Sequence, residues 1–161
     1  MEVTMLANSS LSIWASDPGF NGIKDVEIDS AREQSKESTL NQPTVLVVDD
    51  EELIARTMGE ILRRAGFKTL IAFDGSAALE LALRSNPAFV LTDVVMPKMN
   101  GVELAIAIRN ALPKTEVVLL SGQAGITDIL EDGHGRGYSF ELIAKPVHPE
   151  KILERIRRAL C

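Results

Sequence analysis

The stretch TVLVVDDEE, residues 44–52, decides the fold class of this chain. Its first five residues form a continuous apolar and β-branched run, which is typical of a strand buried on both faces of a parallel sheet. Asp49 and Asp50 follow that run directly. We therefore predict a buried strand whose carboxyl end carries two carboxylates.

Further short apolar runs predict strands at 67–73, 89–92, 117–120 and 142–144. Helical periodicity appears between the strands. The apolar residues Leu53, Met58, Ile61, Leu62 and Ala65 predict a first helix that ends at Gly66. Later helices are predicted from the cap Asp74 to residue 83, at 102–112, around 126–132 and at 149–160. This alternation implies an α/β fold with a five-stranded parallel sheet, because parallel neighbours need helical crossovers.

Composition limits the classes of protein to consider. A chain of 161 residues with 45% hydrophobic and 25% charged residues fits one soluble globular domain with a tail. The net charge of −6 argues against a nucleic-acid partner. No apolar run approaches the roughly 20 residues that cross a bilayer, and no secretory signal is present. Cys161 has no second cysteine to pair with, so a cytoplasmic protein without a membrane partner is the simplest interpretation.

Residues 1–42 differ from the rest of the chain. They contain seven serines, and seven acidic residues against three basic ones. Such a segment cannot bury enough surface to offset its ordering entropy, so we predict a disordered leader, with the folded domain at 43–161. In the alternative interpretation, Leu11, Ile13, Trp14 and Phe20 form a short docking peptide.

Polar residues lie at the carboxyl ends of four predicted strands: Asp49 with Asp50, then Asp93, Ser121 and Lys145. In open α/β sheets the ligand site lies beyond these ends, so the side chains are expected to converge. Carboxylates in one cleft raise one another's pKa unless a cation is present, and Mg²⁺ prefers oxygen ligands. With a cation bound, a carboxylate can attack a phosphoryl group and form an aspartyl phosphate.

Four segments, in this order, carry a resemblance to a known family: VLVVDDEE (45–52), LTDVVMPKMNG (91–101), LLSG (119–122) and AKPV (144–147). They resemble the signatures of the receiver domain of two-component response regulators. The resemblance implies a flavodoxin-like, doubly wound sheet in the order 2-1-3-4-5, flanked by five helices. It also implies phosphorelay signal transduction, with a histidine kinase or histidine phosphotransfer protein as donor and a downstream protein as target.

The resemblance assigns a role to each polar residue. Asp93 is implied as the phosphoacceptor, and Asp49, Asp50, Asp93 and the Val95 carbonyl as the Mg²⁺ ligands. Ser121 is implied as the switch hydroxyl. Lys145, before a cis Pro146, is implied to contact the phosphoryl oxygens.

Some positions depart from the family pattern. Receivers usually carry an aromatic residue three positions before the lysine, where this chain has Leu142. The glycine-rich stretch GHGRG, residues 133–137, matches no phosphate-binding fingerprint and is interpreted as a flexible connector. His134 and His148 lack a metal-ligand pattern and are interpreted as non-functional.

Three functions remain open. The first is a phosphorylated receiver, which is a phosphoacceptor and not an enzyme. We expect it to stand alone, since the chain stops one residue after Leu160. The second is a receiver-like module that binds partners without phosphorylation. The third is a Mg²⁺-dependent phosphohydrolase with its nucleophile on the first strand. Such enzymes tend to have a second aspartate two residues after the nucleophile, but Glu51 occupies that position after Asp49, which counts against this function. Taken singly, Asp49 and Asp50 could also cap the first helix.

Overall fold

The computed structural model describes residues 42–122, 131 and 133–160. The predicted leader and most of the helix predicted around 126–132 therefore lie outside the described residues. None of the helices within the described ranges is long and apolar enough to cross a membrane.

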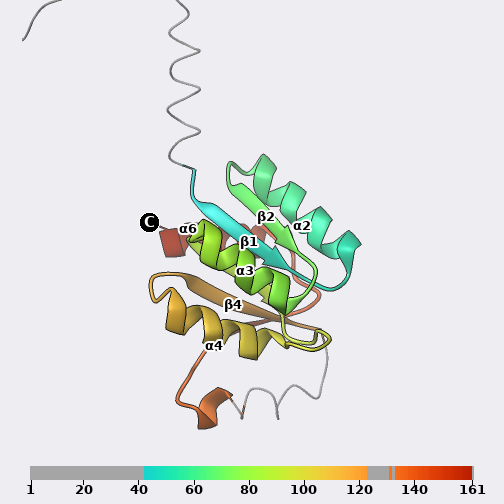
Figure 1. Ribbon diagram of the computed structural model, residues 1–161. Helices are drawn as coiled ribbons and strands as arrows, with labels where there is room; N and C mark the ends of the chain where they lie inside the picture. Colours follow the sequence, from blue (N-terminus) through green and yellow to red (C-terminus); the bar gives the residue numbers. More distant parts are fainter. Residues whose placement is uncertain (1–41, 123–130, 132, 161) are drawn as a thin grey trace, which may run out of the picture. The chain divides into compact units, whose positions relative to one another are not determined.

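The described residues form a five-stranded parallel sheet in the order β2-β1-β3-β4-β5 (Figure 1). Its strands are β1 (Thr44–Val48), β2 (Lys68–Ala72), β3 (Phe89–Asp93), β4 (Glu116–Ser121) and β5 (Glu141–Ala144). The helices with complete bounds are α2 (Glu52–Arg64), α3 (Gly75–Ser85), α4 (Gly101–Ala111) and α6 (Pro149–Leu160). The predicted fold class and strand order are confirmed.

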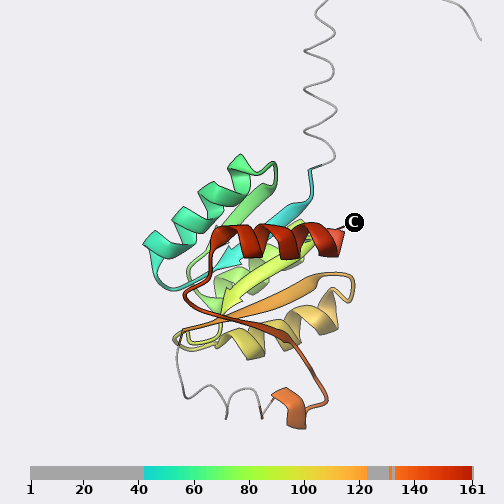
Figure 2. The same ribbon diagram turned by 180° about the vertical axis from the view of Figure 1, so that it is seen from behind.

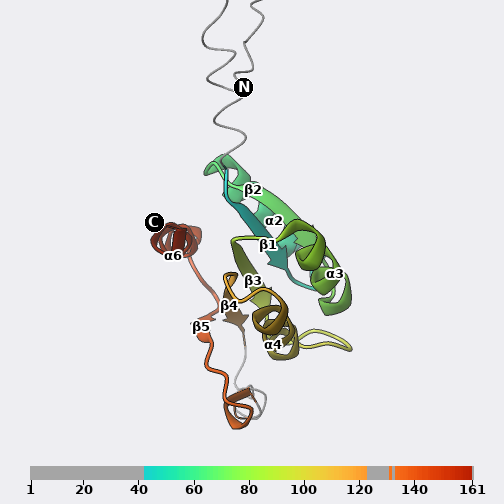
Figure 3. The same ribbon diagram turned by 60° about the vertical axis from the view of Figure 1, so that its left-hand side comes forward.

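Two apolar layers hold the helices on the sheet. On one face, Ala78 and Ala82 of α3 and Leu104 and Ile108 of α4 are buried against the sheet. On the other face, α2 and α6 pack through the side chains Ala55, Leu62, Ile152 and Ile156. In the reverse view of Figure 2, α6 lies in front of the sheet. Figure 3 shows α6 on one side of the strands and α3 and α4 on the other. Both faces are covered, which explains why β1 is buried from Val45 to Val48 and β3 along its whole length.

Strand register aligns the carboxyl ends of the central strands. Val48 pairs with Thr92, and Thr92 pairs with Leu119. Ser121 pairs with Ala144 at the end of β5. The residues that follow these positions therefore meet at one edge of the sheet, as the sequence predicted.

A glycine follows the C-terminal end of α2 and allows the chain to turn. Gly66 has a φ of +95°, and the amide of Phe67 donates to the Leu62 carbonyl, so the chain turns sharply into β2.

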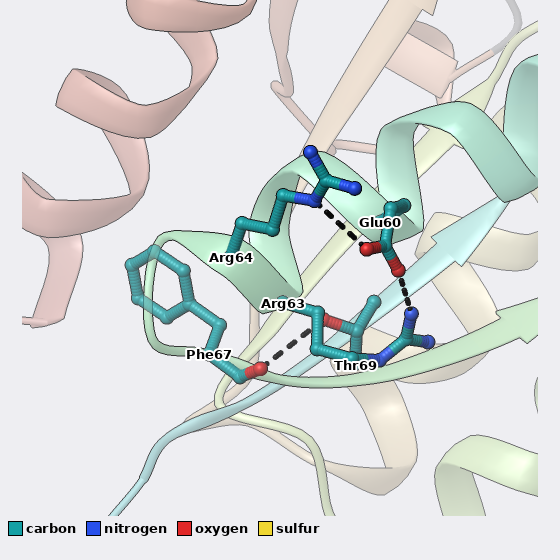
Figure 4. A network of polar contacts seen from close by, with 5 residues as sticks. All are labelled: Glu60, Arg63, Arg64, Phe67 and Thr69. Carbon is teal, nitrogen blue, oxygen red and sulfur yellow. Dashed lines mark hydrogen bonds and ion pairs between the residues drawn. The ribbon is translucent and has the colours of Figure 1, made fainter.

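Glu60 accepts hydrogen bonds from Arg63 and Arg64 on the same helix (Figure 4). Arg64 and then Arg63 hold the pKa of Glu60 below its ordinary value. Both ion pairs are exposed, so they contribute little to stability.

The buried face of α2 differs from the prediction. Ala55, Gly59 and Leu62 face the core, whereas Leu53 is 79% exposed. The core position at Gly59 is narrow, because a Cβ there would lie 2.6 Å from the Ile71 side chain. Small residues at helical spacing thus mark the core face, and the larger Leu53 lies outside it.

The interpretation of residues 133–137 as a connector is wrong. Residues 133–135 have helical backbone. The amide of Gly137 donates to the His134 carbonyl and that of Tyr138 to the Gly133 carbonyl, with Gly137 at a φ of +82°. This is the hydrogen-bond pattern of a helix end at a left-handed glycine, so only the last glycine of GHGRG acts as a breaker.

Candidate functional site

Three carboxylates meet at the carboxyl ends of β1 and β3. Asp49 is 2% exposed, Asp50 is exposed, and Asp93 is 9% exposed. One carboxylate oxygen from each residue lies within 4.8 Å of the others. This set of oxygens could hold one hard cation, which would take oxygen ligands and keep several waters.

Lys145 joins two of these carboxylates. Its Nζ donates to Asp49 Oδ2 at 2.8 Å and lies 3.2 Å from Asp93 Oδ1. The second oxygen of Asp49, Oδ1, accepts the backbone amide of Glu51 at 3.0 Å. Asp49 is therefore held through both of its carboxylate oxygens.

Burial and the attraction between the two groups both act on the pKa values of Asp93 and Lys145. Desolvation raises the pKa of Asp93 above its ordinary value of 3.8, and the nearby Lys145 offsets this only in part. Burial alone would lower the pKa of Lys145, but hydrogen bonding to Asp49 and attraction to both carboxylates outweigh it, so its pKa is raised. The lysine lies closer to Asp49 than to Asp93.

The cleft above Asp93 has a volume of about 270 Å³. Its lining comprises Asp50, Glu51, Ile54, Asp93, Val95, Gly122 and Lys145. Val95 is 53% exposed, and the role of its carbonyl as a metal ligand stays a prediction. Ser121 ends β4 and is buried, but it lies beside the cleft and not among its lining residues. Glu51 and Ile54 are cleft residues that sequence reasoning did not single out, although both lie within five residues of Asp49.

The segment after β5 brings Lys145 to the cleft. The amide of Lys145 donates to the Ser121 carbonyl, which ties the end of β5 to the end of β4. The Lys145–Pro146 peptide bond is cis. Leu142, in the place of the usual aromatic residue, is 38% exposed on β5. Tyr138 and Phe140 stack on each other instead, and the Tyr138 hydroxyl donates to Asn110 of α4 at 2.6 Å.

The alternative role of the paired aspartates as helix caps does not hold. Glu51 occupies the N-cap position of α2, and its side chain forms no capping hydrogen bond. Asp49 bonds the amide of that cap residue, which precedes the helix. Asp74 does cap α3, by accepting the amide of Ala77 at 2.8 Å. The chain uses aspartate as a cap elsewhere, so the different arrangement at Asp49 and Asp50 favours a ligand site.

A larger hollow of about 550 Å³ lies elsewhere, between the loops that follow α3 and α4. Its lining includes Pro87, Leu112, Pro113 and Lys114. It shares none of its lining residues with the acidic cleft. Size alone therefore does not locate the chemistry of this protein.

The fold and the cleft define a doubly wound α/β protein with an acidic, cation-competent site at the ends of its strands. Comparison with known families agrees: the model of the response regulator receiver domain matches residues 45–157. The chain belongs to the response regulator receiver domain family.

The curated relatives that match this chain are longer proteins. The chain is 33% identical over 117 residues to the probable transcriptional regulatory protein TcrX of Mycobacterium tuberculosis, covering 73% of this chain and 49% of that protein. It is 32% identical over 116 residues to the transcriptional regulatory protein SrrA of Staphylococcus aureus, covering 72% and 47%. The chain thus spans about half the length of the curated relatives it matches.

Solved structures match this chain over nearly their whole length. The chemotaxis protein CheY4 of Vibrio cholerae has a TM-score of 0.64 at 27% identity, covering 73% of this chain and 98% of that one. A CheY-like response regulator receiver domain protein of Methanospirillum hungatei has a TM-score of 0.67 at 25% identity, covering 74% and 94%. These similarities agree with the observed strand order.

Proposed function

We propose that this receiver domain accepts a phosphoryl group on Asp93 from a histidine kinase or a histidine phosphotransfer protein. The observation that carries the proposal is the contact of Lys145 with both Asp49 and Asp93 inside an acidic cleft. A lone cation beside several carboxylates is suited to bind the oxygens of an incoming phosphoryl group. The chain acts as a phosphoacceptor and not as an enzyme that turns over a separate substrate.

The chain's own residues would divide the work of transfer. An oxygen of Asp93 forms a bond to phosphorus while the bond from phosphorus to the donor's imidazole nitrogen breaks, and the imidazole leaves with that electron pair. Lys145 moves from the carboxylates toward a phosphoryl oxygen, and the Ser121 hydroxyl reaches another. Burial of Asp93 keeps bulk water from the new acyl phosphate.

Mg²⁺ is the cation that we propose for the acidic cluster. The ligands would be Asp49, Asp50, Asp93 and the Val95 carbonyl, and the bound ion would neutralise charge on the carboxylates and the phosphoryl oxygens. The support is the close set of carboxylate oxygens and their hard-ligand chemistry.

Intact-mass measurement tests the proposal. After treatment with acetyl phosphate and Mg²⁺, the wild-type chain should gain one phosphate, and Asp93→Asn should gain none. A wild-type chain that stays unmodified would favour a module that binds without phosphorylation. Steady release of phosphate from a small ester would favour the phosphohydrolase. That the receiver acts without a further domain stays a prediction, because the matched relatives are about twice as long.

A further inference from the structure

The hollow between the loops that follow α3 and α4 lies at the amino-terminal edge of the sheet. It has a volume of about 550 Å³. Its apolar lining residues are Pro87, Ala88, Ala111, Leu112 and Pro113. Phe89, the first residue of β3, pairs with Val45 near the start of β1 and with Glu116 at the start of β4. The length of β3 therefore separates the hollow from Asp93.

Hydrogen bonds between the two loops give the hollow its shape. The Thr115 hydroxyl donates to the Pro87 carbonyl at 2.8 Å, and the Glu116 amide donates to the Ala88 carbonyl at 3.1 Å. Thr115 and Pro87 are both buried, so the first of these bonds is shielded from competing water. The loops are thus joined without a ligand, and the volume between them lies within the range of roughly 300–1,000 Å³ that ligand pockets have.

The amino-terminal segment of the chain is attached beside the hollow. Ala88 lines the hollow, and its amide donates to the Thr44 carbonyl at 2.9 Å. Residues 1–41, before Thr44, lie outside the described residues. Their sequence contains the apolar residues Leu11, Ile13, Trp14 and Phe20. Thr44 is 24 residues after Phe20, and a chain of that length spans up to roughly 80 Å, so the apolar residues can reach the hollow.

We propose that the hollow is the docking site for residues 11–20 of the same chain, and that it holds the indole of Trp14. An indole is large and apolar with one N–H donor. The hollow offers a mainly apolar lining together with the side-chain amide of Asn86, which matches that chemistry.

Covalent attachment favours this occupant over a separate protein. A tethered segment has an effective concentration of about 1 mM, so a site with a dissociation constant of about 0.1 mM would be about 90% occupied. The inference selects the interpretation of Leu11, Ile13, Trp14 and Phe20 as a docking peptide. It concerns the edge of the sheet opposite Asp93 and does not depend on phosphorylation.

The fluorescence of the full chain tests the proposal, because Trp14 is its only tryptophan. Ala111→Glu places a charge in the hollow, and Ala111 is exposed at the end of α4, so the fold should tolerate the change. Acrylamide should quench Trp14 about threefold less in wild type than in Ala111→Glu, because a docked indole is shielded from solvent. Chymotrypsin should cleave after Trp14 about tenfold more slowly in wild type, since cleavage follows the undocked fraction.

Matched variants complete the test. Ala77→Glu makes the same substitution at an exposed position of α3 outside the hollow, so it should behave as wild type in both measurements. Ile13→Asp should quench and cleave as Ala111→Glu does, because it places a charge in the docking segment. Ile13→Asp changes none of the described residues, so it tests the proposal even if Ala111→Glu fails to fold.

Each contrary result has a distinct meaning. An indole that is fully accessible to acrylamide in both wild type and Ala111→Glu overturns docking. An indole that is shielded in both proteins overturns the hollow as the docking site. Shielding that is lost on dilution shows that the segment of a second copy fills the hollow, which overturns docking within one chain. Asp93→Asn should shield Trp14 as wild type does, so failure of Asp93 as acceptor is distinguishable from failure of docking.

Discussion

A Cβ built on Gly101 would lie 2.0 Å from the backbone carbonyl oxygen of Asp93. The amide of Gly101 also donates to the Val94 carbonyl at 2.9 Å. The loop that leaves β3 thus folds back onto that strand before α4 begins. Asn100 and Glu103 fix this start of α4 by a reciprocal capping box. The backbone at Gly101 is therefore packed closely against the backbone of Asp93.

Gly101→Ala should destabilise the domain by about 1–3 kcal/mol, because the neighbour that must move is backbone and not a flexible side chain. Urea denaturation at pH 7 measures the change. Gly135→Ala is the matched control: Gly135 has helical backbone, and a Cβ there meets nothing within 4 Å. That variant should gain about 0.5–1 kcal/mol from helix propensity. Equal effects of both substitutions would contradict the close approach at Asp93.

Asp93 should make the metal-free domain less stable at neutral pH than at mildly acidic pH. Its pKa in the folded state is raised above the ordinary value of 3.8, mainly by burial. The folded state therefore binds the proton more tightly, and the ionised group costs stability at every pH above its folded pKa. That cost decreases as the pH falls through the folded pKa and is gone below 3.8.

Thermal unfolding of wild type and Asp93→Asn without Mg²⁺ tests whether the ionised Asp93 carboxylate lowers the stability of the folded domain. At pH 7, Asp93→Asn should melt at the higher temperature, because it removes a poorly solvated charge. The difference should shrink as the pH falls toward 4. A wild type that is the more stable protein at pH 7 would show that the pairing with Lys145 outweighs burial.

Sequence periodicity predicted the sheet because each central strand is apolar on both faces, a pattern that half-exposed strands and amphipathic helices do not show. The strand-end rule then placed Asp49, Asp93 and Lys145 together, and the structure agrees within hydrogen-bond distance. These features depend on local composition and on the order of the strands along the chain, and the sequence itself displays both.

Other features depend on packing across elements, which one sequence does not display. Leu53 follows the helical period but lies outside the core, whereas Ala55 and Gly59 are buried and Gly59 lies against Ile71. Gly133 has helical backbone and lies against Val102, where a Cβ would be 3.0 Å away. Propensity alone predicted a break at that glycine.

Asp50→Asn should weaken Mg²⁺ binding at least tenfold, because the cluster loses one of its three carboxylates. Stability without metal should hold or rise, since repulsion among the carboxylates is relieved. Isothermal titration with Mg²⁺ and thermal unfolding with a chelator measure the two effects. Asp74→Asn is the control, because Asp74 caps α3 and asparagine keeps that cap. Unchanged Mg²⁺ affinity in Asp50→Asn would remove this residue from the ligand set.

Lys145→Ala should destabilise the metal-free domain at pH 7 by about 1–3 kcal/mol, because the buried Asp49 carboxylate loses its charged partner. Mg²⁺ restores positive charge to the cluster, so added Mg²⁺ should stabilise this variant more than the wild type. Lys114→Ala, on the exposed loop after α4, should stay within about 0.5 kcal/mol of wild type with or without metal.

The same lysine variant separates metal binding from the response to phosphorylation. Lys145→Ala keeps Asp49, Asp50 and Asp93, so it should still bind Mg²⁺ and still accept a phosphate from acetyl phosphate at a reduced rate. Without the ammonium, the phosphoryl oxygens lose the contact that would distinguish the phosphorylated state from the free one. Hydrogen exchange with and without beryllofluoride should therefore show a smaller change near Ser121 in Lys145→Ala than in wild type. An equal change in both proteins would show that Lys145 stabilises the carboxylates only and does not transmit the signal.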